Sequence, residues 1–129
     1  MFRVLTLGLI LVTACASESG GPLIEGGLYA TPNEDGSFAV LKILKVDDGG
    51  VHVRVYSNRF ATLPTTLAES SLYMVGVDHG PNEGLGMGHL PLSKTSFAGW
   101  RPTFIKAAAV KDEELEGYRM WLEAKGGYF

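Results

Sequence analysis

The sequence predicts a small, mainly β or α+β domain: a curled antiparallel sheet with one C-terminal helix. Two strand-like stretches, Ser37–Val46 and Val51–Ser57, flank the polar turn Asp47–Gly50, which is typical of a β-hairpin. Segment 112–125 has apolar residues at helical spacing and acidic residues in its first turn. The whole chain has 129 residues, the length of a single domain.

The first half of the domain is expected to hold three strands. Gly27–Thr31 is a short strand and precedes the turn 32–36. Ser37–Val46 is apolar on both faces and is expected at the centre of the sheet. The third strand, Val51–Ser57, alternates: one face carries Val51, Val53 and Val55, and the other carries His52, Arg54 and Tyr56.

The second half is less regular. We expect a connection over 58–68, a strand over 71–77, a glycine-rich loop over 78–92, a helical turn from Ser93 to Trp100 and a strand over 103–110. The helix 112–125 follows, with the stripe Leu115, Tyr118, Trp121 and Leu122, and ends at Gly126-Gly127. The hairpin-led order resembles SH3-like barrels in architecture, a resemblance that implies no activity because such folds carry many unrelated functions.

The N-terminal segment has a different composition from the domain. Residues 1–14 contain one charge, Arg3, and the apolar run 4–12, which is too short for a membrane-spanning helix of about 20 residues. A basic start, a short apolar run and small residues are typical of a secretory signal. The predicted organisation is a signal peptide at 1–14, a lipidated cysteine with a flexible tether at 15–25, and one domain at 26–129.

The junction Val12-Thr13-Ala14-Cys15 resembles the lipobox of bacterial lipoproteins. The resemblance covers residues 1–15. It implies a diacylglyceryl thioether on Cys15, cleavage after Ala14, and acylation of the new amine, for instance with palmitate. Two or more buried acyl chains anchor a protein stably to a membrane. The implied location is the bacterial cell envelope, outside the cytoplasm, and Ala16 resembles the outer-membrane type if the host is diderm. The alternatives are a buried structural cysteine and a signal cut elsewhere.

Composition and motifs exclude several function classes. A formal charge of −3 does not suit a nucleic-acid binder, which needs a basic face. The run Gly84–Gly88 lacks the last glycine of the dinucleotide fingerprint, where His89 stands, and no EF-hand spacing is met. No nucleophile elbow occurs. The sequence therefore predicts no cofactor, no metal and no catalytic residue.

Six residues form the candidate binding set: His52, Arg54, Tyr56, Arg59, Trp100 and Arg101. Arginine and aromatic residues are favoured in interface cores. We therefore expect a non-catalytic binding or interaction module that contacts an envelope protein or a cell-wall partner. Alternatively, the aromatic residues complete the core and the charges are merely solvated.

The competing hypothesis is a small envelope hydrolase or metal-dependent enzyme. It uses Asp78, His79 and His89 in the glycine-rich loop. That hypothesis requires the three side chains to converge within hydrogen-bond reach in a cleft.

Overall fold

The structure, a computed structural model, describes residues 22–129. The predicted signal peptide 1–14, Cys15 and most of the predicted tether lie outside the described residues. The rest of the tether is bonded to the sheet: the Ile24 N–H donates to the Tyr29 hydroxyl at 3.1 Å, and that hydroxyl donates to the Pro22 carbonyl. Residues 22–25 therefore pack with the domain.

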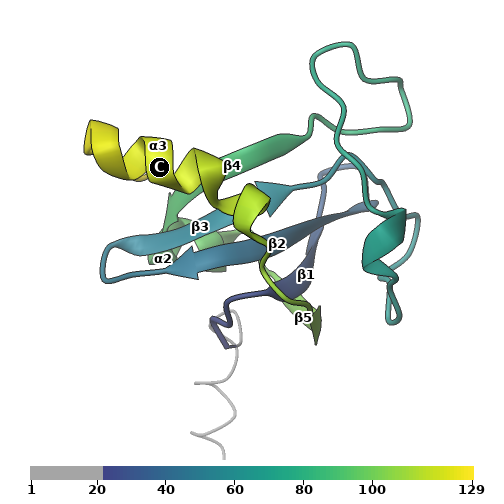
Figure 1. The fold of residues 1–129 in the computed structure, drawn as a ribbon. Coiled ribbons are helices and arrows are strands. Elements are labelled where there is room, and N and C mark those ends of the chain that lie inside the picture. The colour runs from purple at the N-terminus through teal and green to yellow at the C-terminus, as the bar shows by residue number, and fades with distance from the viewer. Residues whose placement is uncertain (1–21) are drawn as a thin grey trace, which may run out of the picture.

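Five antiparallel strands form one sheet in the spatial order β4-β3-β2-β1-β5 (Figure 1). They are β1 (Gly27–Pro32), β2 (Phe38–Val46), β3 (Gly50–Val55), β4 (Met87–Ser93) and β5 (Thr103–Ala107). The predicted class, a small mainly β or α+β fold with a C-terminal helix, is confirmed. Since β4 and β5 are opposite edges of this sheet, the described strands do not close into a barrel.

Both predicted hairpin turns are present, and their side chains explain them. Between β1 and β2, the Asn33 N–H donates to the Ser37 carbonyl at 2.7 Å, and Gly36 takes a φ of 88°, which glycine adopts without steric cost. Between β2 and β3, the Asp47 carboxylate accepts the N–H groups of Gly49 and Gly50 at 3.1 and 3.0 Å. An aspartate that bonds its own backbone two residues on is a common turn device.

The predicted strand over 71–77 is wrong, and part of the predicted loop over 78–92 is strand β4. A short 3₁₀ turn, η1 (Glu69–Ser71), precedes an irregular segment whose Tyr73 carbonyl accepts the Ser57 N–H at 2.8 Å. The neighbouring edge of β3 is instead taken by β4. Pro91 lies within β4, which is acceptable because an edge strand has one side without a pairing strand.

The helices lie on opposite faces of the sheet, with α3 in front and α2 behind in the view of Figure 1. Helix α2 (Lys94–Gly99) begins as predicted, with the Ser93 hydroxyl accepting the Ser96 N–H at 3.0 Å. The C-terminal helix starts as a 3₁₀ turn, η2 (Asp112–Leu115), and continues as α3 (Glu116–Ala124). In residues 22–129, each helix lacks the length and apolar character that crossing a bilayer requires.

The sheet has two buried faces of different composition. The Phe97 face, which α2 covers, is apolar and consists of Tyr29, Leu41, Ile43, Val51, Val53, Leu92 and Phe97. The opposite face, which we call the Lys42 face, is mixed: Leu28, Val40 and Tyr56 pack with Leu67, while Lys42, His52 and Arg54 lie beside them. Loops, η2 and α3 cover this second face.

Candidate functional site

The six candidate binding residues are divided between the two faces of the sheet. His52, Arg54 and Tyr56 share the Lys42 face, and His52 is fully buried at 0% exposure. The other three, Arg59, Trp100 and Arg101, line pockets at the end of the Phe97 face. The structure therefore divides the set over two faces of the sheet, and Tyr56 also lines the pocket of Arg59.

A pocket of about 390 Å³ opens on the Phe97 face at the end of α2. Ala39, Leu41 and Val55 contribute apolar surface from the sheet. Trp100 and Arg101, which directly follow α2, are exposed and add an aromatic ring and a guanidinium. An apolar lining with a few polar groups is typical of a binding pocket.

Arg101 stands in an unusual backbone conformation. Its φ is 55°, in the left-handed region, and its N–H donates to the Ala98 carbonyl at 3.0 Å where α2 ends. This conformation costs a residue with a β-carbon about 1–2 kcal/mol. None of the ion pairs among residues 22–129 involves the Arg101 guanidinium. Strained backbone bearing an unpaired charge motivates a functional hypothesis for this residue.

A second pocket of about 220 Å³ adjoins the first and shares Asn33, Ala39 and Val55 with it. We call the two together the hairpin groove. Arg59 and Leu85 line its far end. Arg59 Nη1 lies 3.4 Å from an Asp35 oxygen, an exposed ion pair of the kind that contributes little stability.

On the Lys42 face, His52 lies in a closed hydrogen-bonded chain. Its Nε2 is 3.0 Å from Asp47 Oδ2, and its Nδ1 is 2.9 Å from Nε2 of His89. Because the Asp47 carboxylate only accepts, the network assigns the proton of neutral His52 to Nε2, and His89 then donates to Nδ1. The Tyr128 hydroxyl lies 2.5 Å from both Asp47 oxygens and donates its one proton to this carboxylate.

This arrangement shifts two pKa values. Burial alone would raise the pKa of Asp47, but the hydrogen bonds from Tyr128 and His52 outweigh it and hold the pKa at about 2. Burial, and then repulsion between the protonated forms of His89 and His52, lowers the pKa of His89. Tyr118 and Trp121 of α3 pack edge-on against His52, with ring centroids 4.7 and 4.4 Å away.

Helix α3 reaches this cluster through Gly117. A β-carbon at that position would stand 2.6 Å from the His89 β-carbon, so only glycine lets the helix approach this closely. The C-terminal residue is also held against the sheet, because Phe129 exchanges backbone hydrogen bonds with Pro91 and Ser93 of β4. We call His52, His89, Asp47, Tyr118, Trp121 and Tyr128 the His52 cluster. Its contacts hold α3 and the C-terminal residues against the sheet.

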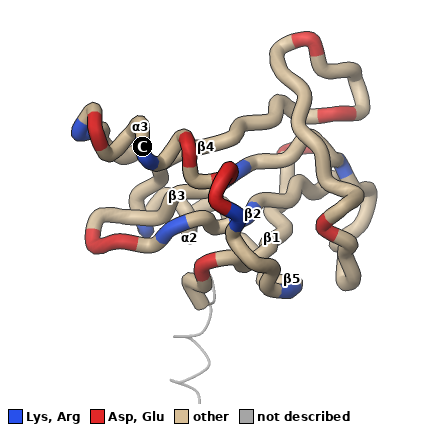
Figure 2. Tube along the Cα trace, in the orientation of Figure 1, with Lys and Arg blue, Asp and Glu red and all other residues tan. Residues whose placement is uncertain are grey.

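Next to it, Lys42 is fully buried and has every proton bonded. Its Nζ lies 2.6 Å from Glu69, 3.0 Å from Glu114 and 2.7 Å from the Ala109 carbonyl. Burial would raise the pKa of Glu114, but the Lys111 N–H and Lys42 together lower it. The acidic η2 segment over the sheet is visible in Figure 2. A lysine in the apolar strand run AVLKILKV was the sequence signal for this buried cluster.

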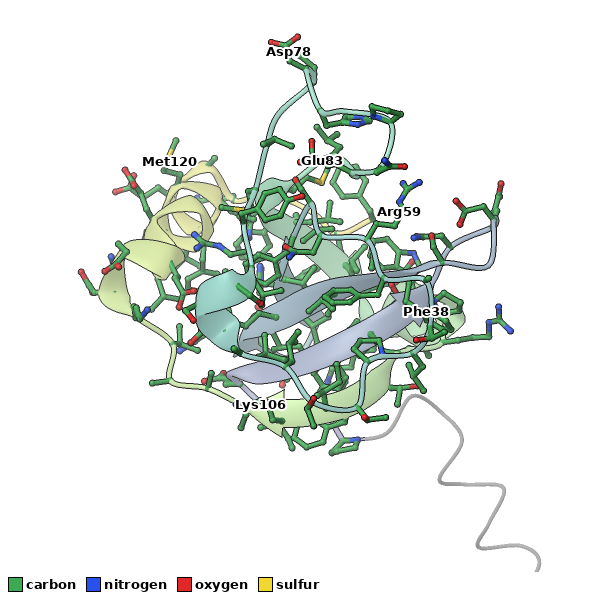
Figure 3. The ribbon with its side chains drawn as sticks, turned by 90° about the vertical axis from the view of Figure 1, so that its right-hand side faces the viewer. Phe38, Arg59, Asp78, Glu83, Lys106 and Met120 are labelled. Carbon is green, nitrogen blue, oxygen red and sulfur yellow. The ribbon has the colours of Figure 1, made fainter. Side chains whose placement is uncertain are left out.

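The three residues of the enzyme hypothesis are not brought together. Asp78 is at the tip of the loop that projects from the domain (Figure 3). His79 bonds its neighbour's carbonyl, that of Gly80, at 3.0 Å, whereas His89 faces His52 in the sheet. Within residues 22–129, no group of three or more histidine, cysteine, aspartate or glutamate side chains has a geometry that suits a metal ion.

Comparison of the chain with protein-family models, with curated proteins and with solved structures gave no match.

Proposed function

We propose that the protein is a lipid-anchored binding module of the bacterial cell envelope. In this proposal Cys15 carries the lipid, and the domain outside the cytoplasm binds a partner protein through the hairpin groove. The observation that carries the binding role is the pocket beside Trp100, where an apolar surface adjoins the unpaired, strained Arg101.

The chemistry of the groove defines the partner segment. Ala39, Leu41 and Val55 suit one apolar side chain, and burying such a side chain fully contributes about 1.5–3 kcal/mol. The Arg101 guanidinium suits a carboxylate, which it can bind through two parallel hydrogen bonds. Glu34 also lines this pocket and disfavours a second acidic group. The occupant we propose is an extended segment with an apolar residue next to one aspartate or glutamate.

Selection from a random peptide library displayed on phage tests the groove. Enriched peptides should pair an apolar residue with Asp or Glu, and their affinity should fall about tenfold or more in Trp100→Ala and in Arg101→Gly. Arg119→Ala is the matched control, because Arg119 is an exposed arginine on α3, paired with Asp112 at 2.6 Å. Enrichment of unrelated peptides, or equal loss in all three variants, would contradict the proposal.

The anchor is tested separately in the full-length chain. Expression in a bacterial host with an alkyne analogue of palmitate should label the protein, and Cys15→Ser should remove both the label and the membrane association. A label that persists in Cys15→Ser would exclude lipidation at this residue without touching the groove proposal.

A further inference from the structure

A third pocket, of about 350 Å³, lies on the Lys42 face; it shares no residue with the Trp100 end of the hairpin groove and shares only Tyr56 with the Arg59 end. It is lined by Arg54, Tyr56, Glu69, Ser70, Leu72, Lys111 and Glu114. Strand β3 supplies Arg54, η1 supplies Glu69 and Ser70, and the segment entering η2 supplies Lys111. Three separate parts of the chain therefore bring charged and hydroxyl groups to one hollow.

The two carboxylates of this pocket are already engaged. Glu69 and Glu114 both accept hydrogen bonds from the buried Lys42, and Glu114 also accepts the Lys111 N–H at 2.8 Å. Because Lys42 lies between them, the negative charge of the two carboxylates is partly neutralised within the protein. They leave little capacity for a further cation.

The donors of the pocket are not engaged to the same degree. Arg54 makes only two long hydrogen bonds, both 3.5 Å, to Gly88 and Glu114. Lys111 forms no ion pair among residues 22–129. The lining holds two cations, Arg54 and Lys111, and two carboxylates, Glu69 and Glu114, and the buried Lys42 beneath it compensates part of the charge of those carboxylates.

The Tyr56 hydroxyl is the second observation that points to a ligand. The side chain is 6% exposed, with its ring in the cluster of Leu28 and Val40. Burial, then the charge of Glu114, raises its pKa to about 12, so the hydroxyl stays protonated and is a donor. No hydrogen bond of this hydroxyl occurs within the described chain, although buried polar groups are nearly always paired.

We propose that this pocket binds a small organic oxyanion, a carboxylate or a phosphate monoester, between Arg54, Lys111 and the Tyr56 hydroxyl. Arg54 supplies a planar fork of donors that matches either oxyanion, and Lys111 adds a point charge. A volume of about 350 Å³ is larger than a bare phosphate ion needs, which favours an oxyanion attached to a small polar body.

Chemical-shift titration of the ¹⁵N-labelled full-length protein with glycerol phosphate, succinate and inorganic phosphate tests this site, with sodium chloride at equal ionic strength as the control. We expect saturable shifts around Arg54, Ser70 and Lys111 with at least one of the three oxyanions. Glycerol phosphate or succinate should bind more tightly than inorganic phosphate. A response no larger than that to chloride would overturn the proposal.

Tyr56→Phe is the decisive variant, because it keeps the ring and removes only the hydroxyl. It should weaken oxyanion binding about tenfold, as expected for one hydrogen bond to a charged group, while Tyr73→Phe should leave it unchanged. Arg54→Met should weaken it further. Affinity unchanged in Tyr56→Phe, with the fold intact, would overturn the assignment. Arg101→Gly should leave oxyanion binding intact, which separates failure of this site from failure of the groove.

Discussion

The Phe97 face and the Lys42 face both contain side chains with no solvent exposure, but different interactions hold them. Phe97 packs edge-on against Tyr29 at a centroid distance of 5.4 Å, within a cluster that has no titratable group other than the tyrosine. Lys42 and His52 are equally buried and depend on carboxylates for their partners. The Phe97 face is stabilised mainly by removal of apolar surface from water, whereas the Lys42 face depends also on the hydrogen bonds and ion pairs of Lys42 and His52.

This difference also separates the two candidate sites. The hairpin groove lies where the apolar face runs past the end of α2 and is left open, so it offers apolar surface. The third pocket, which Arg54, Tyr56 and Lys111 line, lies where the Lys42 face has donors left after its internal pairing, so it offers hydrogen bonds and charge. Each site therefore offers a ligand the same kind of interaction that stabilises the face of the sheet on which it lies.

The largest expected effect is on the apolar face. Phe97→Ala should lower the free energy of unfolding by about 3–5 kcal/mol, because it removes a buried ring and leaves a cavity. Urea unfolding at pH 7 and at pH 5 should show nearly the same loss, since no charge is involved. A loss that depends strongly on pH would show that the two faces are not independent.

On the Lys42 face, Lys42→Met should cost about 3 kcal/mol at pH 7, because it removes the closer of the two cations of the buried Glu114 and leaves only Arg54 at 3.5 Å. The pKa of Glu114 is lowered in the wild type, so its stabilising contribution is present above the unfolded-state pKa and is lost as pH falls through the folded-state value. The cost of Lys42→Met should therefore shrink below about pH 4.5.

The double variant Lys42→Met with Glu114→Gln is the control for that experiment. Removing both members of a buried pair is less costly than removing one, so the double variant should recover part of the stability at pH 7. No recovery would show that Lys42 acts through packing of its aliphatic chain and not through its charge.

The His52 cluster should give a smaller effect that appears only as a pH dependence. The pKa of His89 is lowered in the folded state, so the folded protein binds this proton less well than the unfolded chain. The stabilising contribution is complete above the unfolded pKa of about 6.5 and is lost as pH falls below it. Urea unfolding should therefore show a decline in wild-type stability between pH 7 and pH 5.

His89→Gln is the variant that isolates this histidine. Glutamine still offers an N–H to His52 Nδ1 but does not titrate, so the decline between pH 7 and pH 5 should become smaller. Asp47, with a pKa of about 2, keeps its charge between pH 7 and pH 5 and therefore does not contribute to the decline. An unchanged decline would assign the pH dependence to another group.

The sequence predicts local structure well where side chains bond their own backbone. Asp47 fixes the β2–β3 turn and Ser93 caps α2, and both predictions rest on residues within three positions of each other. The strand predicted at 71–77 failed because strand propensity does not say which segment pairs with β3. That choice depends on long-range contacts, as with Gly117 of α3 against His89 of β4.

The candidate sites show the same limit. Alternation places His52, Arg54 and Tyr56 on one strand face, as the structure has them, but it does not say that α3 covers His52. Trp100 and Arg101 belong to the opposite side because α2 carries the chain across the Phe97 face before they occur. The partners of Lys42 are 27 and 72 residues away in sequence, at Glu69 and Glu114, so no spacing rule finds them.

The smallest expected effect tests whether the left-handed backbone of Arg101, at the open end of the Phe97 face, contributes to binding. Arg101→Gly should raise the free energy of unfolding by about 0.5 kcal/mol, because relief of the left-handed backbone slightly exceeds the entropy that glycine adds to the unfolded chain. The same variant should weaken peptide binding to the hairpin groove. Arg101→Lys, which keeps a charge and the strain, should not be stabilised and should retain part of the binding. If Arg101→Gly gains stability and still binds fully, the strain serves no binding role, and Trp100 with the apolar surface alone defines the groove.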